Sequence, residues 1–390
     1  MKLSSKNIHL AVHESDPVFG SVIPPIYTSS TFIFPTAREG AKRFAGVSHG
    51  MIYSRFTNPT VEALEVRLAA LEEGEKAIVT SSGMSAISLT LLHLLKTGDT
   101  ILAHKVLYGC TFSLITNLLT RFGIKVKMID FRDINSIKNA IDPSVKVIYF
   151  ESPTNPLLEI IDIKKIAALA KKNKILTVFD NTFAPPPCQY PIRLGMDVVV
   201  HSLTKYINGH SDVIGGAVIG SQKLISQMFS KSFIDLGPCI SPFNAYLILR
   251  GMTTLEIRIK KQSESTEKIA RFLEKHPKIQ KVYYPKLSSH PQHLLAKQQM
   301  AQFGGVLSFE VKGGRSAGEK LVNSVKLIDL AVSLGAVESL IEHPASMTHA
   351  KMGKVELEKS GIGESLVRLS IGLEDTDDLI ADLKQALAKI

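Results

Sequence analysis

Short apolar runs alternate with segments of helical periodicity from Lys76 onward. The first run, KAIVTSS at 76–82, is followed by an apolar helical segment at 86–95. Further runs lie at 100–108, 125–131, 146–152 and 175–181. Strands that alternate with helices in this way form a mainly parallel sheet with helices on both faces. The sequence therefore predicts an α/β fold, and ligands of such sheets bind beyond the carboxyl ends of the strands.

The pattern changes beyond about residue 250. A long amphipathic segment at 253–276 leads into strand-like runs, and a last helical segment covers 375–390. A chain of 390 residues exceeds the length at which single cores stop growing. We expect a large α/β domain at 58–250 and a smaller α+β C-terminal domain at 251–390.

The first fifty or so residues show no clear period and are broken by Pro17, Pro24, Pro25 and Pro35. Such a segment cannot easily fold on itself, so residues 1–57 are expected to form an arm that lies against a neighbouring subunit. An irregular terminal tail is the alternative. A helical segment follows at 61–72, with Thr60 as its candidate N-cap.

Charge and cysteine usage narrow the class of protein. The net charge of +10 invites a nucleic-acid hypothesis, but the lysines are spread over helix-like segments and form no dense block with aromatic residues. We expect no nucleic-acid partner. Three distant cysteines indicate no disulfide framework, residues 1–20 show no signal peptide, and the longest apolar stretch is too short to span a bilayer. A cytoplasmic protein without a membrane partner is the expectation.

One lysine stands just past a predicted strand end. Val198–Val200 lead into His201-Ser202-Leu203-Thr204-Lys205. In a cleft, desolvation and nearby cations would lower the pKa of Lys205 enough for amine chemistry. Ser202 and Thr204, two residues apart, could bind a phosphate, and the combination suits pyridoxal phosphate, whose aldehyde condenses with a lysine. A surface lysine is the alternative.

Other strand ends supply possible partners for such a cofactor. Asp180 closes one run and could meet a pyridinium nitrogen, and Tyr108, followed by Gly109, could stack on a flat ring. The turn Ser82–Ser85 between strand and helix could approach an anion. Each has a structural alternative: Asp180 could be a helix cap, Tyr108 a buried core residue, and Ser82–Ser85 an ordinary tight turn.

Three residues are candidates for holding a substrate. Arg368 lies within LVRLS, and an arginine among apolar strand residues requires a partner. A substrate carboxylate and a structural ion pair with a glutamate are both open. Ser333 ends the strand-like run LIDLAVS, and the two prolines of ESPTNP fix a loop able to aim Asn155 at a ligand.

A series of motifs, taken together and in order, resembles the Cys/Met metabolism family of pyridoxal phosphate enzymes. The motifs are YSRFTNPT, SSGMSAI, LYGCTF, ESPTNP, VFDNTF, HSLTKYINGHSD, AVSLG, HPASMTH and VRLSIGLE. The resemblance covers almost the whole chain. It implies the aspartate aminotransferase-like PLP fold type I and a homotetramer built as a dimer of dimers, with active sites shared between subunits. No metal is implied.

The resemblance also assigns roles to individual residues. Lys205 would carry pyridoxal 5'-phosphate covalently, Asp180 would meet the pyridine nitrogen and Tyr108 would stack on the ring. The phosphate would be held by Ser82, Gly83, Met84, Ser202 and Thr204, joined by Tyr53 and Arg55 of the partner subunit. Arg368, with Ser333 and Asn155, would bind the α-carboxylate of a small sulfur amino acid.

The substrate expected from the resemblance is methionine. Three features are most similar to members that cleave methionine: Cys110 within LYGCTF, the stretch LAKQQM and the stretch HPASMTHA. In addition, Ile52 is apolar, whereas relatives that handle cystathionine tend to carry an acidic residue at this place. We expect α,γ-elimination to methanethiol, 2-oxobutanoate and ammonia. Lys205 would remove the α-proton, Tyr108 would protonate the thiolate with a pKa lowered by cations such as Arg55, and Cys110 would tune thiol access.

One departure points elsewhere. Where lyases that use the cysteine usually carry a Lys-Asp pair, this chain has Ile234-Asp235, and the following GPCISPFNAY is closer to homoserine sulfhydrylases. Cystathionine cleavage and γ-replacement on an acylated homoserine therefore stay open as alternatives. A non-enzymatic basic binding protein is the remote one.

Overall fold

The computed structural model describes residues 2–10, 20–348, 350 and 361–390. Its larger sheet has seven strands in the order β1-β7-β6-β5-β4-β2-β3. These are β1 Lys76–Thr80, β2 Thr100–His104, β3 Lys125–Ile129, β4 Val145–Glu151, β5 Leu176–Asp180, β6 Val198–Ser202 and β7 Gly216–Gly220. Strands β2 to β6 pair in parallel, whereas β7 is antiparallel to both of its neighbours. The expected mainly parallel α/β sheet is thus confirmed.

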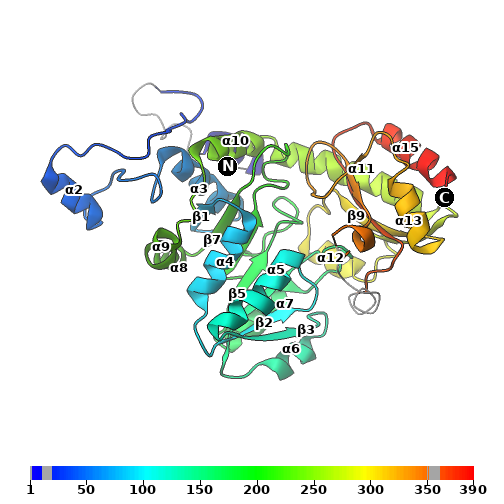
Figure 1. Cartoon of the computed structure of the whole chain (residues 1–390), viewed down its shortest axis with the longest axis horizontal. Coiled ribbons are helices and arrows are strands. Elements are labelled where there is room, and N and C mark those ends of the chain that lie inside the picture. Colours follow the sequence, from blue (N-terminus) through cyan, green and yellow to red (C-terminus); the bar gives the residue numbers. More distant parts are fainter. Residues whose placement is uncertain (1, 11–19, 349, 351–360) are drawn as a thin grey trace.

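Helices cover both faces of this sheet (Figure 1). Successive residues of one strand face opposite clusters: Val178 packs with residues of α4 on one side, and Phe179 packs with residues of α7 on the other. Because both faces are buried, Val198, Val199 and Val200 in β6 are all fully buried. Burial on both faces explains why the sequence has a continuous run of β-branched residues here.

The helices follow the expected alternation closely. They are α1 Leu3–His9, α2 Ala37–Phe44, α3 Pro59–Leu71, α4 Gly83–Leu94, α5 Gly109–Ser113, α6 Ile134–Ala140, α7 Ile163–Lys172, α8 Gln222–Met228, α9 Ile234–Leu236, α10 Pro242–Met252, α11 Leu255–Glu274, α12 His293–Gln299, α13 Gly314–Val322 and α15 Thr376–Ala388. Among the described residues, no helix is long and apolar enough to cross a membrane.

A second, smaller sheet has the order β10-β11-β12-β9-β8. Its strands are β8 Ile279–Tyr283, β9 Val306–Val311, β10 Asp329–Leu330, β11 Leu340–Glu342 and β12 Leu366–Ser370. Helices α11, α13 and α15 pack on it through one buried apolar cluster. The run at 327–335 was expected to be a strand that ends at Ser333, but β10 has only two residues and Ser333 lies in the loop after it.

Helix α1 packs against α3 and α11, whereas residues 20–57 extend away from the body of the chain and carry α2 at their far end (Figure 1). Apolar side chains lie exposed along this segment, with Val22 83%, Ile33 94% and Val47 74% exposed. The helix that follows is capped by Asn58, whose side chain accepts from the N–H of Thr60. Thr60 itself was the expected cap, but its hydroxyl is used to hold the arm, because it donates to the carbonyl of Pro25 at 2.8 Å.

Candidate active site

Three neighbouring strands of the large sheet end at the same edge, and the last residue of each strand has a polar side chain. β4 ends at Glu151, β5 at Asp180 and β6 at Ser202. Glu151 pairs in register with Asp180, and Asp180 with Val200. Because the carboxyl ends of parallel strands meet at a common edge, the residues predicted from separate motifs are brought to one place.

Lys205 lies in the turn just past β6 and points to a residue 128 positions further along the chain. Its Nζ donates to Ser333 Oγ at 2.6 Å. Burial, and then the charge of Arg368, lower the pKa of Lys205 to about 8, while the carboxylate of Glu342 acts in the opposite sense. The amine is therefore partly neutral near neutral pH and available as a base or a nucleophile.

Arg368 is buried in β12 and is the centre of a polar cluster. Its Nη1 donates to Asn155 Oδ1 and its Nη2 to the carbonyl of Ser333, each at 3.0 Å. The same Nη1 lies 3.0 Å from Glu342 Oε1. The ion pair with a glutamate, one of the two explanations that the sequence left open, is thus present. Asn155, Ser333 and Lys205 also converge on this arginine, as the other explanation requires.

Ser333 connects the lysine to the arginine. Its hydroxyl accepts from Lys205, and its carbonyl accepts from Arg368. The backbone φ of Ser333 is +116°, a region that residues with a Cβ rarely adopt. Strain of this kind costs about 1–3 kcal/mol and persists only where the surroundings impose it. The two hydrogen bonds of this residue supply such a constraint.

Asp180 is buried at the end of β5. Its Oδ1 accepts from the N–H of Thr182 at 3.0 Å, and its Oδ2 lies 3.5 Å from the hydroxyl of Tyr149. Burial raises the pKa of Asp180, and the hydrogen bonds from Thr182 oppose this effect. A buried carboxyl with few donors is suited to a cationic partner such as a pyridinium N–H.

Tyr108 stands at the start of α5, is 46% exposed and has open space beside Gly109. Its N–H donates to Glu151 Oε2 at 3.2 Å. A hydrogen bond with the side chain of Cys110, burial and the charges of Cys110 and Asp180 raise the pKa of Tyr108 to about 12. The expected lowering of this pKa by Arg55 of a neighbouring subunit stays a prediction, because the causes within the described part of the single chain include no cation.

The start of α4 and the end of β6 form a narrow cradle. Ser82 caps α4, and its Oγ accepts from the N–H of Ser85 at 3.0 Å. A Cβ on Gly83 would lie 2.8 Å from Ser202 Cβ, so only glycine permits this approach. The structure thus brings Ser82, Gly83 and Ser202 together. The sulfur of Met84, on the same helix, lies 3.9 Å from the hydroxyl of Thr111.

The hydroxyl of Thr204 has a partner within its own loop. Its Oγ1 accepts from the N–H of Gly215 at 3.2 Å and lies 3.5 Å from the carbonyl of that residue. The loop after β6 is thereby closed onto the start of β7.

Three predicted residues lie on the N-terminal arm. The carbonyl of Ile52 accepts from the N–H of Phe32 at 3.2 Å, and Tyr53 forms an isolated bridge with Thr31. The guanidinium of Arg55 donates to the carbonyl of Ile234 and lies 4.6 Å from the ring centre of Phe56. These contacts belong to the arm and α9.

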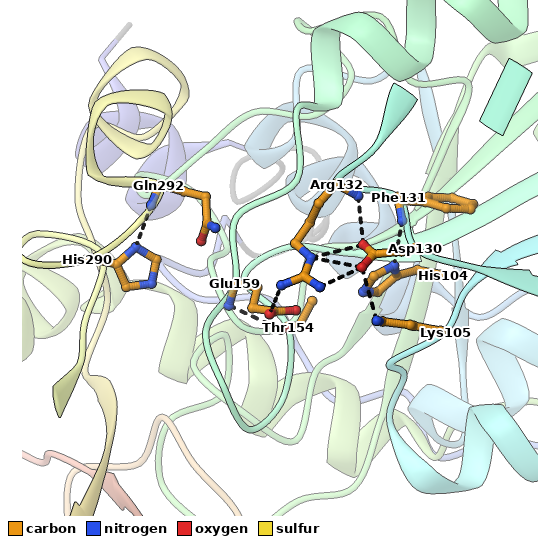
Figure 2. Close-up of polar contacts among 9 residues, drawn as sticks. All are labelled: His104, Lys105, Asp130, Phe131, Arg132, Thr154, Glu159, His290 and Gln292. Carbon is orange, nitrogen blue, oxygen red and sulfur yellow. Dashed lines mark hydrogen bonds and ion pairs between the residues drawn. The ribbon is translucent and has the colours of Figure 1, made fainter. Parts of the chain in front are cut away.

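The loop that carries Asn155 is braced by an ionic network (Figure 2). Arg132 binds Asp130, with Nε 2.9 Å from Oδ1, and also contacts Glu159; Lys105 lies 3.0 Å from Asp130. The N–H of Glu159 donates to Thr154 Oγ1 at 3.1 Å. The ends of β2 and β3 are thereby linked to the loop immediately before Asn155.

Two carboxylates of this region were not predicted as site residues. Glu151 accepts from the N–H groups of both Tyr108 and Asn155, each at 3.2 Å, and Glu342 faces Arg368. Burial, and then the charge of Asp180, raise the pKa of Glu151 to about 8. Each of these glutamates ends an apolar run, in KVIYFE and in SLIE, and this pattern could have identified them as buried charged residues of the site.

Comparison with known proteins agrees with this geometry. The family model of the Cys/Met metabolism PLP-dependent enzymes matches residues 4–388. An L-methionine gamma-lyase of Fusobacterium nucleatum subsp. polymorphum is 51% identical over 375 residues, 96% of this chain and 95% of the relative. A cystathionine beta-lyase of Coxiella burnetii is 43% identical, over 99% of this chain and 97% of the relative.

Among solved structures, a Campylobacter jejuni protein has a TM-score of 0.95 and 38% identity, covering 100% of both chains. That protein was solved with N'-pyridoxyl-lysine-5'-monophosphate at its position 205. The fold is accordingly that of the PLP fold type I enzymes, with a mostly parallel central sheet and a second, smaller sheet. This chain belongs to the Cys/Met metabolism family of pyridoxal phosphate-dependent enzymes.

Proposed function

We propose that the protein catalyses α,γ-elimination of L-methionine to methanethiol, 2-oxobutanoate and ammonia. The observation that carries the proposal is the pairing of an amine and a guanidinium through one residue: Ser333 accepts from Lys205 with its hydroxyl and from Arg368 with its carbonyl. A reactive amine is thereby fixed beside a group that binds carboxylates, as chemistry on an α-amino acid requires.

The residues present fit pyridoxal 5'-phosphate. The N-terminus of α4 lies at a cradle that a single Cβ on Gly83 would fill, and such a helix end favours a phosphate. We propose that Ser82, Gly83, Met84, Ser202 and Thr204 hold the phosphate. Asp180 would meet the ring nitrogen, Tyr108 would cover the ring and Lys205 would hold the aldehyde carbon.

When bound, the cofactor acts as an electron sink for the carbanion that forms at the α-carbon. The chain's own residues supply the remaining steps. Lys205, with its lowered pKa, removes the α-proton and can carry protons between neighbouring carbons. Arg368 and Asn155 orient the carboxylate. Tyr108 is the proposed proton donor to the departing thiolate, and this role requires that cations of the assembled site lower its pKa from the raised value of the single chain.

The preference for methionine is supported by sequence relatives and by one side chain. Relatives named L-methionine gamma-lyase are 46–51% identical to this chain. Ile52 is apolar and suits a thioether that ends in a methyl group, whereas a substrate with a distal ammonium would favour an acid at this place. Cys110 is exposed close to Tyr108, and we propose that it tunes access of the thiol group.

The N-terminal arm is proposed to complete a second subunit's site within a homotetramer. Its exposed apolar side chains are left uncovered by this chain, and large exposed apolar surfaces mark contacts between proteins. Tyr53 and Arg55 would then reach the phosphate bound by the neighbouring subunit. The proposed division of the chain is an arm at 1–57, a large domain at 58–250 and a smaller domain at 251–390, in a cytoplasmic enzyme.

A γ-replacement reaction is the second candidate, and a specific departure favours it. Ile234 stands where a lysine is expected for cysteine lyases, and an O-succinylhomoserine sulfhydrylase of Pseudomonas aeruginosa is 42% identical over 94% of this chain. Every cofactor residue would serve either reaction. The two reactions must therefore be distinguished by the substrate that is consumed and the product that forms.

A product assay separates the candidates. Purified enzyme is given L-methionine, L-cystathionine, or O-acylated homoserine with a thiol, and 2-oxobutanoate, methanethiol and new thioether are measured. The proposal expects methanethiol and 2-oxobutanoate in equal amounts from methionine. New thioether from acylated homoserine, without methanethiol from methionine, would establish the replacement reaction instead. Ile234→Lys is expected to increase activity toward cysteine.

A further inference from the structure

Glu342 is a buried carboxylate that lies directly across the sheet from Arg368. In the antiparallel pair of β11 and β12, the two residues are register partners. Their side chains are 1% and 6% exposed, and Glu342 Oε1 lies 3.0 Å from Arg368 Nη1. A charged group so completely removed from water requires a partner, and this arginine is its nearest cation.

The pair is close but not closed by hydrogen bonds. The N–H groups of Arg368 point to Asn155 and to the carbonyl of Ser333, and neither carboxyl oxygen of Glu342 has a hydrogen-bond partner among the described residues. The carboxylate is therefore held by charge alone. Burial raises the pKa of Glu342, while Arg368 and Lys205 oppose that effect.

A substrate carboxylate would bring a second anion to the same guanidinium. We propose that Glu342 is a built-in counter-anion of Arg368 that opposes the incoming α-carboxylate and so sets how weakly the enzyme holds its amino acids. This inference rests on the proposed function of Arg368 as the carboxylate-binding residue. Removing the charge leaves the arginine in place, because Asn155 and Ser333 still hold it.

The test measures binding without turnover. The holoenzyme is titrated calorimetrically with 4-(methylsulfanyl)butanoate, which has the carboxylate and thioether of methionine at the same spacing but no amine, and with its neutral amide. In Glu342→Gln, Kd for the carboxylate is expected to fall about tenfold, the scale of a like-charge interaction several ångströms away in a partly screened site. Kd for the amide should stay unchanged.

The matched control is Glu310→Gln. Glu310 lies on β9 of the same sheet and accepts from the hydroxyl of Tyr283 at 2.6 Å, so its loss changes the net charge equally without touching Arg368. Glu342→Met removes the same charge with a similar volume, and whichever of the two variants folds with full cofactor content must show the tightening. Steady-state kinetics of methionine should show a lower KM with a smaller change in kcat.

Equal or weaker carboxylate binding in a folded variant of Glu342 would overturn the inference. Tightening of the amide and the carboxylate alike would also overturn it, since the effect would then be one of shape. The proposed methionine reaction is judged separately by products from the wild type. An enzyme that forms no methanethiol, yet binds the carboxylate more tightly after Glu342→Gln, would contradict the substrate and support the counter-anion.

Discussion

The reactivity of Lys205 can be predicted quantitatively from its surroundings. The ordinary pKa of a lysine is 10.5, and burial together with Arg368 lowers it to about 8. At pH 7 the neutral fraction of the amine therefore rises from about 0.03% to about 10%, which is roughly 300-fold. A lowered lysine pKa means that the amine loses its proton as pH rises through about 8, and above that pH nothing more is gained.

The assay is covalent capture of pyridoxal phosphate by the apoenzyme. Cofactor is removed, saturating pyridoxal phosphate is added, and the rate constant is followed by absorbance between pH 6 and 10. We expect the rate to rise until about pH 8 and then to level off. Nα-acetyl-lysine in solution serves as the control for the titration of the cofactor itself, and its rate should keep rising toward pH 10.5.

Arg368→Gln tests the cause of this effect. Since burial is the larger cause and the arginine the second, the plateau should move to higher pH without reaching that of the free lysine. A wild-type rate that continues to climb to pH 10 would refute the reasoning, because the amine would then be solvated and unperturbed.

Three further changes have expected outcomes. Gly216→Ala would place a Cβ 2.0 Å from the carbonyl oxygen of Ser82, so urea unfolding should show a loss of about 1–3 kcal/mol or more, and the rise in Tm on adding cofactor should shrink. Glu151→Gln sets an amide N–H against a backbone donor and should cost about 1–3 kcal/mol. Because burial raises the pKa of Glu151 to about 8, its contribution to stability is present below pH 4.5 and lost as pH rises toward 8, so the cost measured by urea unfolding should be largest at low pH and smaller at pH 8. Ser333→Gly should be about 1–3 kcal/mol more stable than Ser333→Ala in urea, since both lose the hydroxyl but only glycine relieves the φ of +116°.

Much of the fold follows from local pattern. The apolar runs that end at Glu151, Asp180 and Ser202 became neighbouring parallel strands, because runs buried on both faces leave a signal that does not depend on distant residues. Because the carboxyl ends of parallel strands meet at one edge of a sheet, the separate motifs could be assigned to one site. The segment before Ser333 pairs with β11 only at Asp329 and Leu330, and Ser333 lies in the loop beyond, where Lys205 and Arg368 hold it.

What the sequence could not show depends on long-range pairing and on charge. The partner of Arg368 was left open between a substrate and a glutamate, and only the register of β11 with β12 identifies Glu342. Within the single chain Cys110, burial and Asp180 raise the pKa of Tyr108, whereas the lowering by Arg55 was expected from a neighbouring subunit and stays a prediction. Asn58 took the helix cap because Thr60 was needed by the arm.

The central claim is that Lys205 carries the cofactor. The holoenzyme is reduced with borohydride, digested, and its peptides are mapped by mass spectrometry. The account predicts a pyridoxyl-phosphate mass on the peptide that contains HSLTK, located at Lys205, and no such mass in Lys205→Ala. A label on another lysine, or an unlabelled Lys205 in a fully reduced holoenzyme, would contradict it.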